Sequence, residues 1–185
     1  MLDSKPTWVA VMTHANVESL VAERFRTATP EIECYLPMIT VKDKRFKRNM
    51  TPEKAMFPCY LFARINNKQI YQTRTTRGVI AIVSSAHSII PVPDREIEAV
   101  RLFEASQRKV YFHETAQLVR GARTVITSGE FAGLEGTLVR HCKDGNFCVS
   151  IEAMNISVVV RVRRDELKPA QQPEESNGGE DSNAE

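Results

Sequence analysis

The 185-residue chain has few of the features that mark membrane, secreted or metal-binding proteins. It contains no run close to the ~20 consecutive apolar residues that span a bilayer, and its first residues lack the apolar segment of a signal peptide. Its four cysteines form no Cys-x-x-Cys pair and have no paired histidines at zinc-site spacing. We therefore expect a cytoplasmic protein with reduced thiols, no bound metal and no membrane contact.

Sequence signatures of catalysis are also missing. The histidines, His14, His87, His113 and His141, are scattered, and no Gly-x-Ser-x-Gly or phosphate-loop string occurs. No carboxylate pair stands out. The sequence predicts a protein that is not an enzyme and needs no cofactor.

Charge is unevenly distributed, although the net charge is only +2. Residues 169–185 hold five acids and no Lys or Arg, so the remainder has 25 basic against 23 − 5 = 18 acidic side chains, a net +7. Residues 42–54 carry six cations against two acids. Such a local cluster can attract a polyanion, which the overall charge cannot.

The first 107 residues alternate between apolar runs and helical patterns. The runs predict strands at 8–12, 34–41, 56–65, 79–83 and 89–92. The helical patterns predict helices at 17–28, 67–75 and 94–107, with Asn16 and Asp94 as N-caps. Residues 42–55 then join two strands as a long, basic hairpin connection. This order is typical of an α+β domain in which helices flank an antiparallel sheet.

After residue 107 the pattern contains only short β-type runs, at 118–119, 124–127, 136–141, 147–152 and 157–162. Close glycine, aspartate and asparagine turns between such runs suit a small five-stranded barrel. We expect a first domain at 1–107, a linker at 108–115, an all-β domain at 116–168 and a disordered acidic tail at 169–185.

Several strings resemble one family. Trp-Val-Ala-Val at 8–11, Met-Phe-Pro-Cys-Tyr-Leu-Phe at 56–62 and Thr-Thr-Arg-Gly-Val at 75–79 resemble the N-terminal domain of NusG-type transcription elongation factors. Residues 121–136 are similar to the KOW motif that follows this domain, with three glycines at turns or close approaches. The resemblance covers residues 7–168. It implies an α+β N-terminal domain followed by a small all-β KOW (SH3-like) barrel.

Two further strings resemble one subgroup of this family. Leu-Pro-Met-Ile-Thr at 36–40 and Thr-Arg-Gly at 76–78 resemble specialised paralogues typified by RfaH and the UpxY regulators. This implies an operon-specific elongation and antitermination regulator that binds bacterial RNA polymerase and suppresses pausing or termination. The chain departs from the family pattern at Val9, where a tyrosine is usual, at Cys59, where a glycine is common, and at His14-Ala15, where RfaH has a basic pair.

The resemblance also implies a polymerase-docking patch. Family members dock on the clamp helices of the largest polymerase subunit, and Phe57, Pro58 and Tyr60 match the string that contributes to that patch. Strand alternation predicts Phe57 and Leu61 on one face of the sheet and Tyr60 and Phe62 on the other. The alternative is that these are ordinary sheet residues.

Nucleic-acid contacts are implied in two places. Thr76 and Arg77, with Arg74 nearby, match the stretch by which RfaH-like proteins meet the non-template DNA strand. The hairpin tip, with Lys44, Arg45, Lys47 and Arg48, predicts electrostatic attraction to DNA upstream of the bubble. The alternatives are a solvated face for the arginines and a solubilising loop for the tip.

The predicted barrel implies a further partner. NusG homologues contact Rho or a ribosomal protein through the KOW domain, and Phe131 is the residue expected to be exposed there, with a packed core phenylalanine as the alternative. Some RfaH-like barrels also form a helical hairpin, but Val158, Val159 and Val160 favour strand. Because KOW barrels occur in ribosomal proteins, the alternative function is a ribosome-associated or RNA-binding protein.

Overall fold

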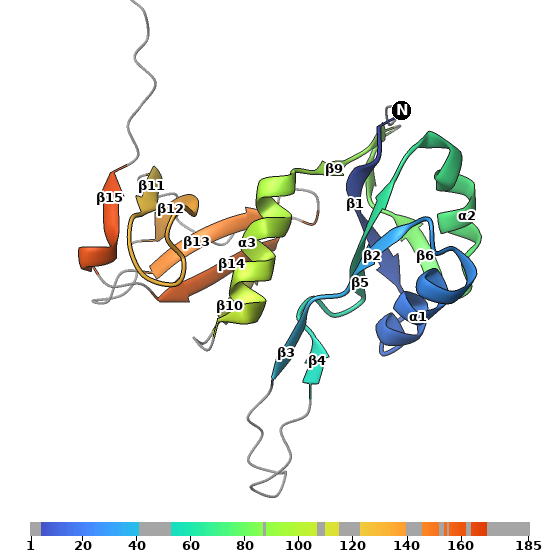
Figure 1. Ribbon diagram of the computed structural model, residues 1–185, viewed down its shortest axis with the longest axis horizontal. Helices are drawn as coiled ribbons and strands as arrows, with labels where there is room; N and C mark the ends of the chain where they lie inside the picture. The colour runs from blue at the N-terminus through green and yellow to red at the C-terminus, as the bar shows by residue number, and fades with distance from the viewer. Residues whose placement is uncertain are drawn as a thin grey trace, which may run out of the picture.

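The computed structural model describes residues 5–40, 53–86, 88–106, 110–114, 123–139, 146–151, 154, 156–161 and 164–169. Its helices and strands form two parts that follow one another along the chain, as Figure 1 shows. The predicted acidic tail lies outside the described residues from residue 170 onward.

An antiparallel sheet forms the first part. Its strands are β1 (Thr7–Thr13), β2 (Glu33–Tyr35), β5 (Tyr60–Ile65), β6 (Val79–Ile82) and β9 (Pro91–Val92). The order is β2-β5-β1-β6, and β9 pairs with the N-terminal end of β1 beyond β6. A short hairpin of β7 (Ser84–Ser85) and β8 (Ser88–Ile89) connects β6 with β9. The predicted antiparallel sheet is confirmed.

Strand β1 is apolar along most of its length because both faces of the sheet are covered. Val9 and Val11 pack into one core, whereas Trp8 and Ala10 pack into another with Phe62 of β5. Alternate residues of a strand point to opposite faces. A strand covered on both sides therefore reads as a continuous apolar run rather than an alternating one.

Helices cover the two faces. On one face lie α1 (Glu18–Ala28), α2 (Ile70–Thr75) and the preceding 3-10 turn η1 (Asn67–Gln69), and on the other lies α3 (Asp94–Ala105). Val21 and Phe25 are the buried apolar residues of α1. Leu20, which fits the predicted helical stripe, is exposed, because the sheet contacts a narrower face of the helix than the pattern suggested.

Both predicted N-caps are wrong. Asn16 has φ +62° and lies in the turn between β1 and α1, while Val17 holds the cap position without a side-chain hydrogen bond. Asp94 is the first residue of α3, because Pro93 already supplies the extended cap conformation. In the first turn, the Asp94 carboxylate still interacts favourably with the helix dipole.

The long hairpin is confirmed as two separate ladders. Near the sheet, β2 pairs with β5, and further out β3 (Met38–Thr40) pairs with β4 (Glu53–Ala55). Pro37 lies between β2 and β3, and its carbonyl accepts a hydrogen bond from the Met56 N–H at 2.8 Å. The break at a proline agrees with the inability of this residue to donate to a ladder.

A second antiparallel sheet forms the C-terminal part. Its strands are β10 (Val110–Glu114), β11 (Arg123–Ile126), β12 (Glu135–Val139), β13 (Asn146–Ile151), β14 (Ile156–Arg161) and β15 (Leu167–Pro169), with a 3-10 turn η4 (Arg164–Glu166). The order is β10-β14-β13-β12-β11-β15. Strands β11 to β14 coincide with four of the predicted runs, and the run at 118–119 lies outside the described residues. The pairings among the described residues form an open path, so closure into a barrel stays a prediction.

The predicted linker at 108–115 is wrong for most of its length. Residues 110–114 form β10, which pairs with β14 along its whole length. This segment begins Val-Tyr-Phe, and β-branched and aromatic residues suit a strand once a partner strand is present.

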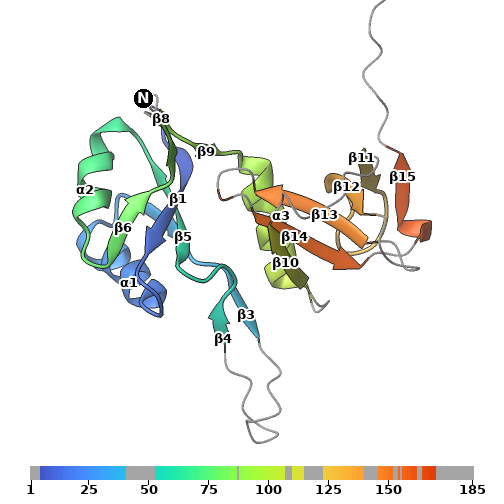
Figure 2. The ribbon, with the colours of Figure 1, turned by 180° about the vertical axis from the view of Figure 1, so that it is seen from behind.

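Helix α3 belongs to a core that continues from one part of the molecule into the other. Figures 1 and 2 show α3 between the first sheet and the C-terminal sheet, where it contacts β13. The core around it contains residues of the first sheet, such as Phe62, and residues of the second, such as Val158. Phe103 of α3 and Phe131 form a direct pair, with ring centroids 5.3 Å apart. The two parts therefore share buried surface in this arrangement.

Candidate functional site

The Phe-Pro-Cys-Tyr string at 57–60 forms the turn that leads into β5. Cys59 has φ +66°, and the Tyr60 N–H donates to the Phe57 carbonyl at 3.1 Å. Both main-chain groups of Cys59 are held: its N–H donates to the Glu18 carboxylate at 2.7 Å, and its carbonyl accepts from the Thr13 N–H at 2.8 Å. Residues of β1 and α1 thus fix the turn.

The turn places the side chains differently from the predicted alternation. Phe57, only 1% exposed, packs edge-to-face with Phe62 at 5.8 Å between centroids, whereas Leu61 lies in the core on the opposite face. The prediction is wrong because the residues before Tyr60 are not extended. Pro58 is exposed and Tyr60 is half-buried, so these two of the three predicted docking residues reach the surface.

An aromatic cluster lies on the same face of the sheet. Tyr35 stacks on Phe62 with centroids 6.1 Å apart and meets Trp8 edge-on at 6.4 Å. The Arg101 guanidinium of α3 lies 4.9 Å from the Tyr35 ring centroid and 6.0 Å from that of Trp8. Cation–π attraction therefore adds to apolar packing where α3 meets the sheet.

Glu104, one turn after Arg101, binds the base of the hairpin. Its carboxylate accepts from the Tyr35 hydroxyl at 2.7 Å and from the Met38 N–H at 2.6 Å. Burial, followed by the hydrogen bond to Glu104, raises the pKa of the Tyr35 phenol above its ordinary value. The phenol therefore stays protonated and remains a donor.

The predicted DNA-contacting residues lie where α2 ends. Arg74 and Arg77 are exposed. The Thr76 hydroxyl donates to the Gln72 carbonyl at 2.9 Å, so it closes the helix end rather than offering a donor to a ligand. The Arg24 side chain of α1 donates to the Arg77 carbonyl at 2.6 Å and fixes the chain there.

Gly78 follows these residues with φ +97°. A β-carbon at this position would lie 2.7 Å from Cγ2 of Val21. Glycine is therefore required both by the backbone angle and by the close approach of α1. The basic hairpin tip, Lys44, Arg45, Lys47 and Arg48, lies outside the described residues.

The predicted exposure of Phe131 is wrong, and the packed alternative is correct. Phe131 is 1% exposed and contacts Phe103. The turn between Gly129 and Gly133, which carries Phe131, folds inward because Gly133, at φ +91°, donates its N–H to the Ile126 carbonyl at 2.7 Å. This closes the arc onto β11 and brings the ring over α3.

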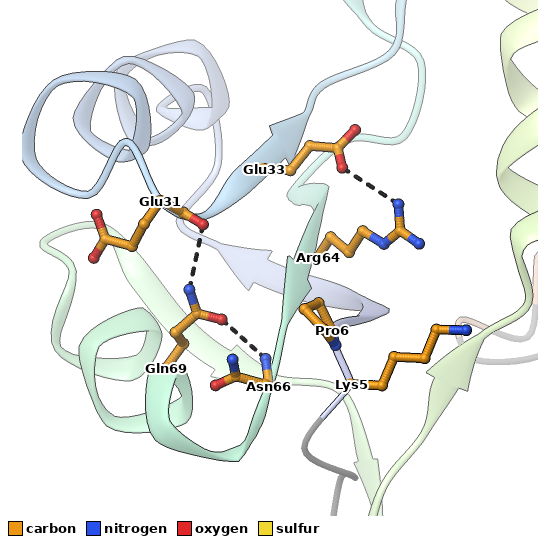
Figure 3. A pocket seen from close by; sticks show the side chains of 7 residues that line it. All are labelled: Lys5, Pro6, Glu31, Glu33, Arg64, Asn66 and Gln69. Atoms are coloured by element: carbon orange, nitrogen blue, oxygen red, sulfur yellow. Dashed lines mark hydrogen bonds and ion pairs between the residues drawn. The ribbon is translucent and has the colours of Figure 1, made fainter.

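A shallow pocket of about 430 Å³ lies between η1, β2 and the start of β1. Figure 3 shows its lining, in which Arg64 and Glu33 form an ion pair at 3.6 Å and the Gln69 side chain donates to the Glu31 carbonyl at 3.3 Å. Lys5 and Arg64 face two carboxylates across it, so the pocket has no dominant charge. Its polar groups largely bind one another, as expected of a structural surface.

The described residues contain no group of three or more His, Cys, Asp or Glu side chains that could hold a metal. Burial raises the pKa of the Cys34 thiol to about 12, so this thiol is protonated and poorly nucleophilic at neutral pH. No helix in the described part is long and apolar enough to cross a membrane.

Three positioning residues had no distinct sequence signal. Glu18 is buried and binds the Cys59 turn, although a carboxylate of an amphipathic helix ordinarily faces solvent. Arg24 donates a hydrogen bond to the Arg77 carbonyl, 53 positions further along the chain. Glu104 accepts one from the Met38 N–H, 66 positions earlier. Their partners are set by how the helices pack, which periodicity alone does not specify.

Comparisons with known proteins give a family and a fold. The family model described as transcription termination factor NusG matches residues 6–101, slightly more than half of the chain. A structure on domain interaction in Thermotoga maritima NusG aligns with a TM-score of 0.53 and 20% identity, over 90% of this chain and 98% of that one. This likeness concerns the fold.

Two conformations of the MjSpt4:Spt5 complex give weaker alignments. Conformation B has a TM-score of 0.33 and 14% identity over 89% of this chain and 97% of that one. Conformation A has a TM-score of 0.31 and 13% identity over 90% and 99%. Among curated protein sequences, none matches this chain significantly.

Proposed function

Because this chain belongs to the NusG family of transcription factors, we propose that it binds bacterial RNA polymerase and suppresses pausing or termination during elongation. The observation that carries the proposal is the family match over residues 6–101, which spans the first sheet and most of α3. Such a factor binds the elongating conformation of the polymerase more tightly than the paused one. It can shift the population of polymerase between these conformations only as far as its affinities for the two differ.

The proposed docking surface is centred on the Cys59 turn. Pro58 and Tyr60 present apolar surface there, and Phe57 supports them from the core. A turn held by hydrogen bonds from two elements loses little conformational entropy on binding. Its partner is the clamp-helix region of the largest polymerase subunit.

The proposed nucleic-acid contacts lie on a different part of the first domain. Arg74 and Arg77 contact the non-template strand, and Thr76 shapes the end of the helix that carries Arg74. The hairpin tip supplies cations for upstream DNA. Guanidinium groups suit this role because they bind phosphate and also stack on unpaired bases.

The C-terminal sheet is proposed to be a KOW barrel that binds a ribosomal protein or Rho. Phe131 takes part in such a contact only after it leaves Phe103. The Leu-Pro-Met-Ile-Thr and Thr-Arg-Gly strings support an operon-specific paralogue similar to RfaH and UpxY rather than a general factor.

A pull-down with RNA polymerase core enzyme tests the docking surface. Pro58→Ala combined with Tyr60→Ala should weaken polymerase binding by roughly 5- to 30-fold, the effect of losing about 1–2 kcal/mol at an interface centre. Leu20→Ala, an exposed apolar residue of α1, is the matched control and should leave binding unchanged. Phe57 is left intact because its removal would disturb the core.

Equal binding by the double variant and the parent chain would show that the docking surface is misplaced. Tight RNA binding without polymerase binding would favour the ribosome-associated alternative. Transcript mapping with and without the protein would then separate readthrough at one operon from readthrough at many.

A further inference from the structure

Tyr71 has the largest exposed fraction, 78%, among the exposed large apolar side chains of the described residues. An aromatic ring contributes to folding mainly through the surface that it buries. A ring this exposed stabilises the fold little, so packing does not account for it. Its exposed face is available to a ligand.

Two exposed cations follow this ring closely in the sequence. Arg74 is three residues further along α2, which places both side chains on one side of the helix. Arg77 follows directly after the helix end. In both ribbon views α2 lies on the side of the first part away from the C-terminal sheet (Figures 1 and 2). The nearby Glu31 carboxylate accepts a hydrogen bond from the Gln72 side chain at 2.8 Å, and no ion pair between it and either arginine is found among the described residues.

The neighbouring hydroxyl groups are used within the helix. Thr73 donates to the Gln69 carbonyl at 2.9 Å, Thr75 to the Tyr71 carbonyl at 3.0 Å and Thr76 to the Gln72 carbonyl at 2.9 Å. These bonds stabilise a short helix and remove its hydroxyl donors. The ring and the two guanidinium groups remain for recognition.

An aromatic face beside two cations matches the chemistry of single-stranded nucleic acid. Phosphates bind guanidinium groups, and an unpaired base stacks on a tyrosine ring, whereas the bases of a duplex are already stacked inside it. We propose that Tyr71 stacks on an unpaired base of single-stranded DNA whose phosphates are bound by Arg74 and Arg77. This rests on the proposed function, because it adds a base-contacting residue to the proposed non-template-strand surface.

Binding of the full chain to a single-stranded oligonucleotide of about 12 nucleotides, with 2-aminopurine at its centre, tests the proposal. Tyr71→Ala should weaken binding by about 5- to 150-fold, which corresponds to the loss of about 1–3 kcal/mol for one stacking contact. It should also abolish the fall in 2-aminopurine fluorescence that binding of the parent chain causes. Tyr71→Phe keeps the ring and should bind within about twofold of the parent. Ile80→Ala, another exposed apolar residue, is the matched control.

The same sequence as a duplex separates stacking from charge. Tyr71→Ala should leave duplex binding unchanged, whereas Arg74→Ala with Arg77→Ala should weaken both forms and reduce the salt dependence. The proposal is overturned if the parent chain does not bind the single strand, or if Tyr71→Ala binds it as well as the parent does.

Polymerase binding by the same variants keeps the two proposals distinguishable. Tyr71→Ala should still bind polymerase core enzyme through the Cys59 turn. Stacking that depends on Tyr71, together with no polymerase binding by the parent chain, would contradict the proposed function alone. Polymerase binding by the parent chain, together with single-strand binding that does not depend on Tyr71, would contradict only the role of Tyr71.

Discussion

Cys59 adopts a backbone conformation that residues with a β-carbon rarely adopt. Its φ of +66° lies in the left-handed region, where the side chain costs roughly 1–2 kcal/mol. The turn persists because the Glu18 carboxylate and the Thr13 N–H hold its main-chain groups. The family glycine at this position is the residue that the conformation favours, so Cys59 is strained in a turn that glycine would fit.

We therefore predict that Cys59→Gly raises the free energy of unfolding by about 0.5–1 kcal/mol, because relief of strain exceeds the entropy that glycine loses on folding. Urea denaturation measures this. Asn16→Gly is the matched control: Asn16 has φ +62°, but asparagine tolerates this region, so little gain is expected. A loss of stability in Cys59→Gly would mean that the cysteine side chain contributes packing that outweighs its backbone strain.

At the scale of elements, the last turn of α3 holds the hairpin in place. The Glu104 carboxylate accepts from a main-chain N–H on the hairpin and from the phenol of Tyr35 at the edge of the sheet. Hydrogen bonds to a charged acceptor are stronger than neutral ones. A single side chain therefore couples the position of the helix to that of β3.

Glu104→Ala should lower the free energy of unfolding by about 1.5–3 kcal/mol, because two partly buried donors lose their charged acceptor. Tyr35→Phe should cost less, and the double variant should cost less than the sum of the two. Glu98→Ala, an exposed position on the same helix, should change stability by under about 0.5 kcal/mol. Strictly additive effects in the urea-unfolding cycle would contradict the coupling.

At the scale of the whole molecule, one core joins the two sheets through α3. Phe103 and Phe131 meet within it, and Trp8, the single tryptophan, lies in the same cluster on the first sheet. Tryptophan fluorescence therefore reports the first sheet, while far-UV circular dichroism reports both.

Because this core is continuous, Phe131→Ala should lower the free energy of unfolding by about 3–5 kcal/mol and should shift the fluorescence transition of Trp8 together with the circular dichroism transition. Ile80→Ala should move neither, since Ile80 is exposed. A shift confined to circular dichroism, with the tryptophan signal unchanged, would show that the two parts unfold independently in solution.

Local patterns predicted the helices and strands well where the spacing of apolar residues along the sequence indicates which side chains are buried. The continuous apolar runs gave β1 and β5, helical spacing gave α1 and α3, and the polar stretch after Val41 gave the hairpin. The failures occurred where chain direction changes. Asparagine suits both an N-cap and a left-handed turn, so Asn16 was ambiguous, and a left-handed cysteine before Tyr60 leaves no compositional signal.

By itself, the sequence determined the order of the main strands and helices of the first part, its antiparallel sheet and the family, because period, turn residues and short motifs are local properties of a chain. Only the tertiary structure decided that Phe57 and Phe131 are buried, that Glu18 and Glu104 hold distant backbone, and that Tyr71 stands exposed beside Arg74. Burial and partners depend on which surfaces meet in space. That meeting is set by packing between elements far apart in the sequence, which no local pattern contains.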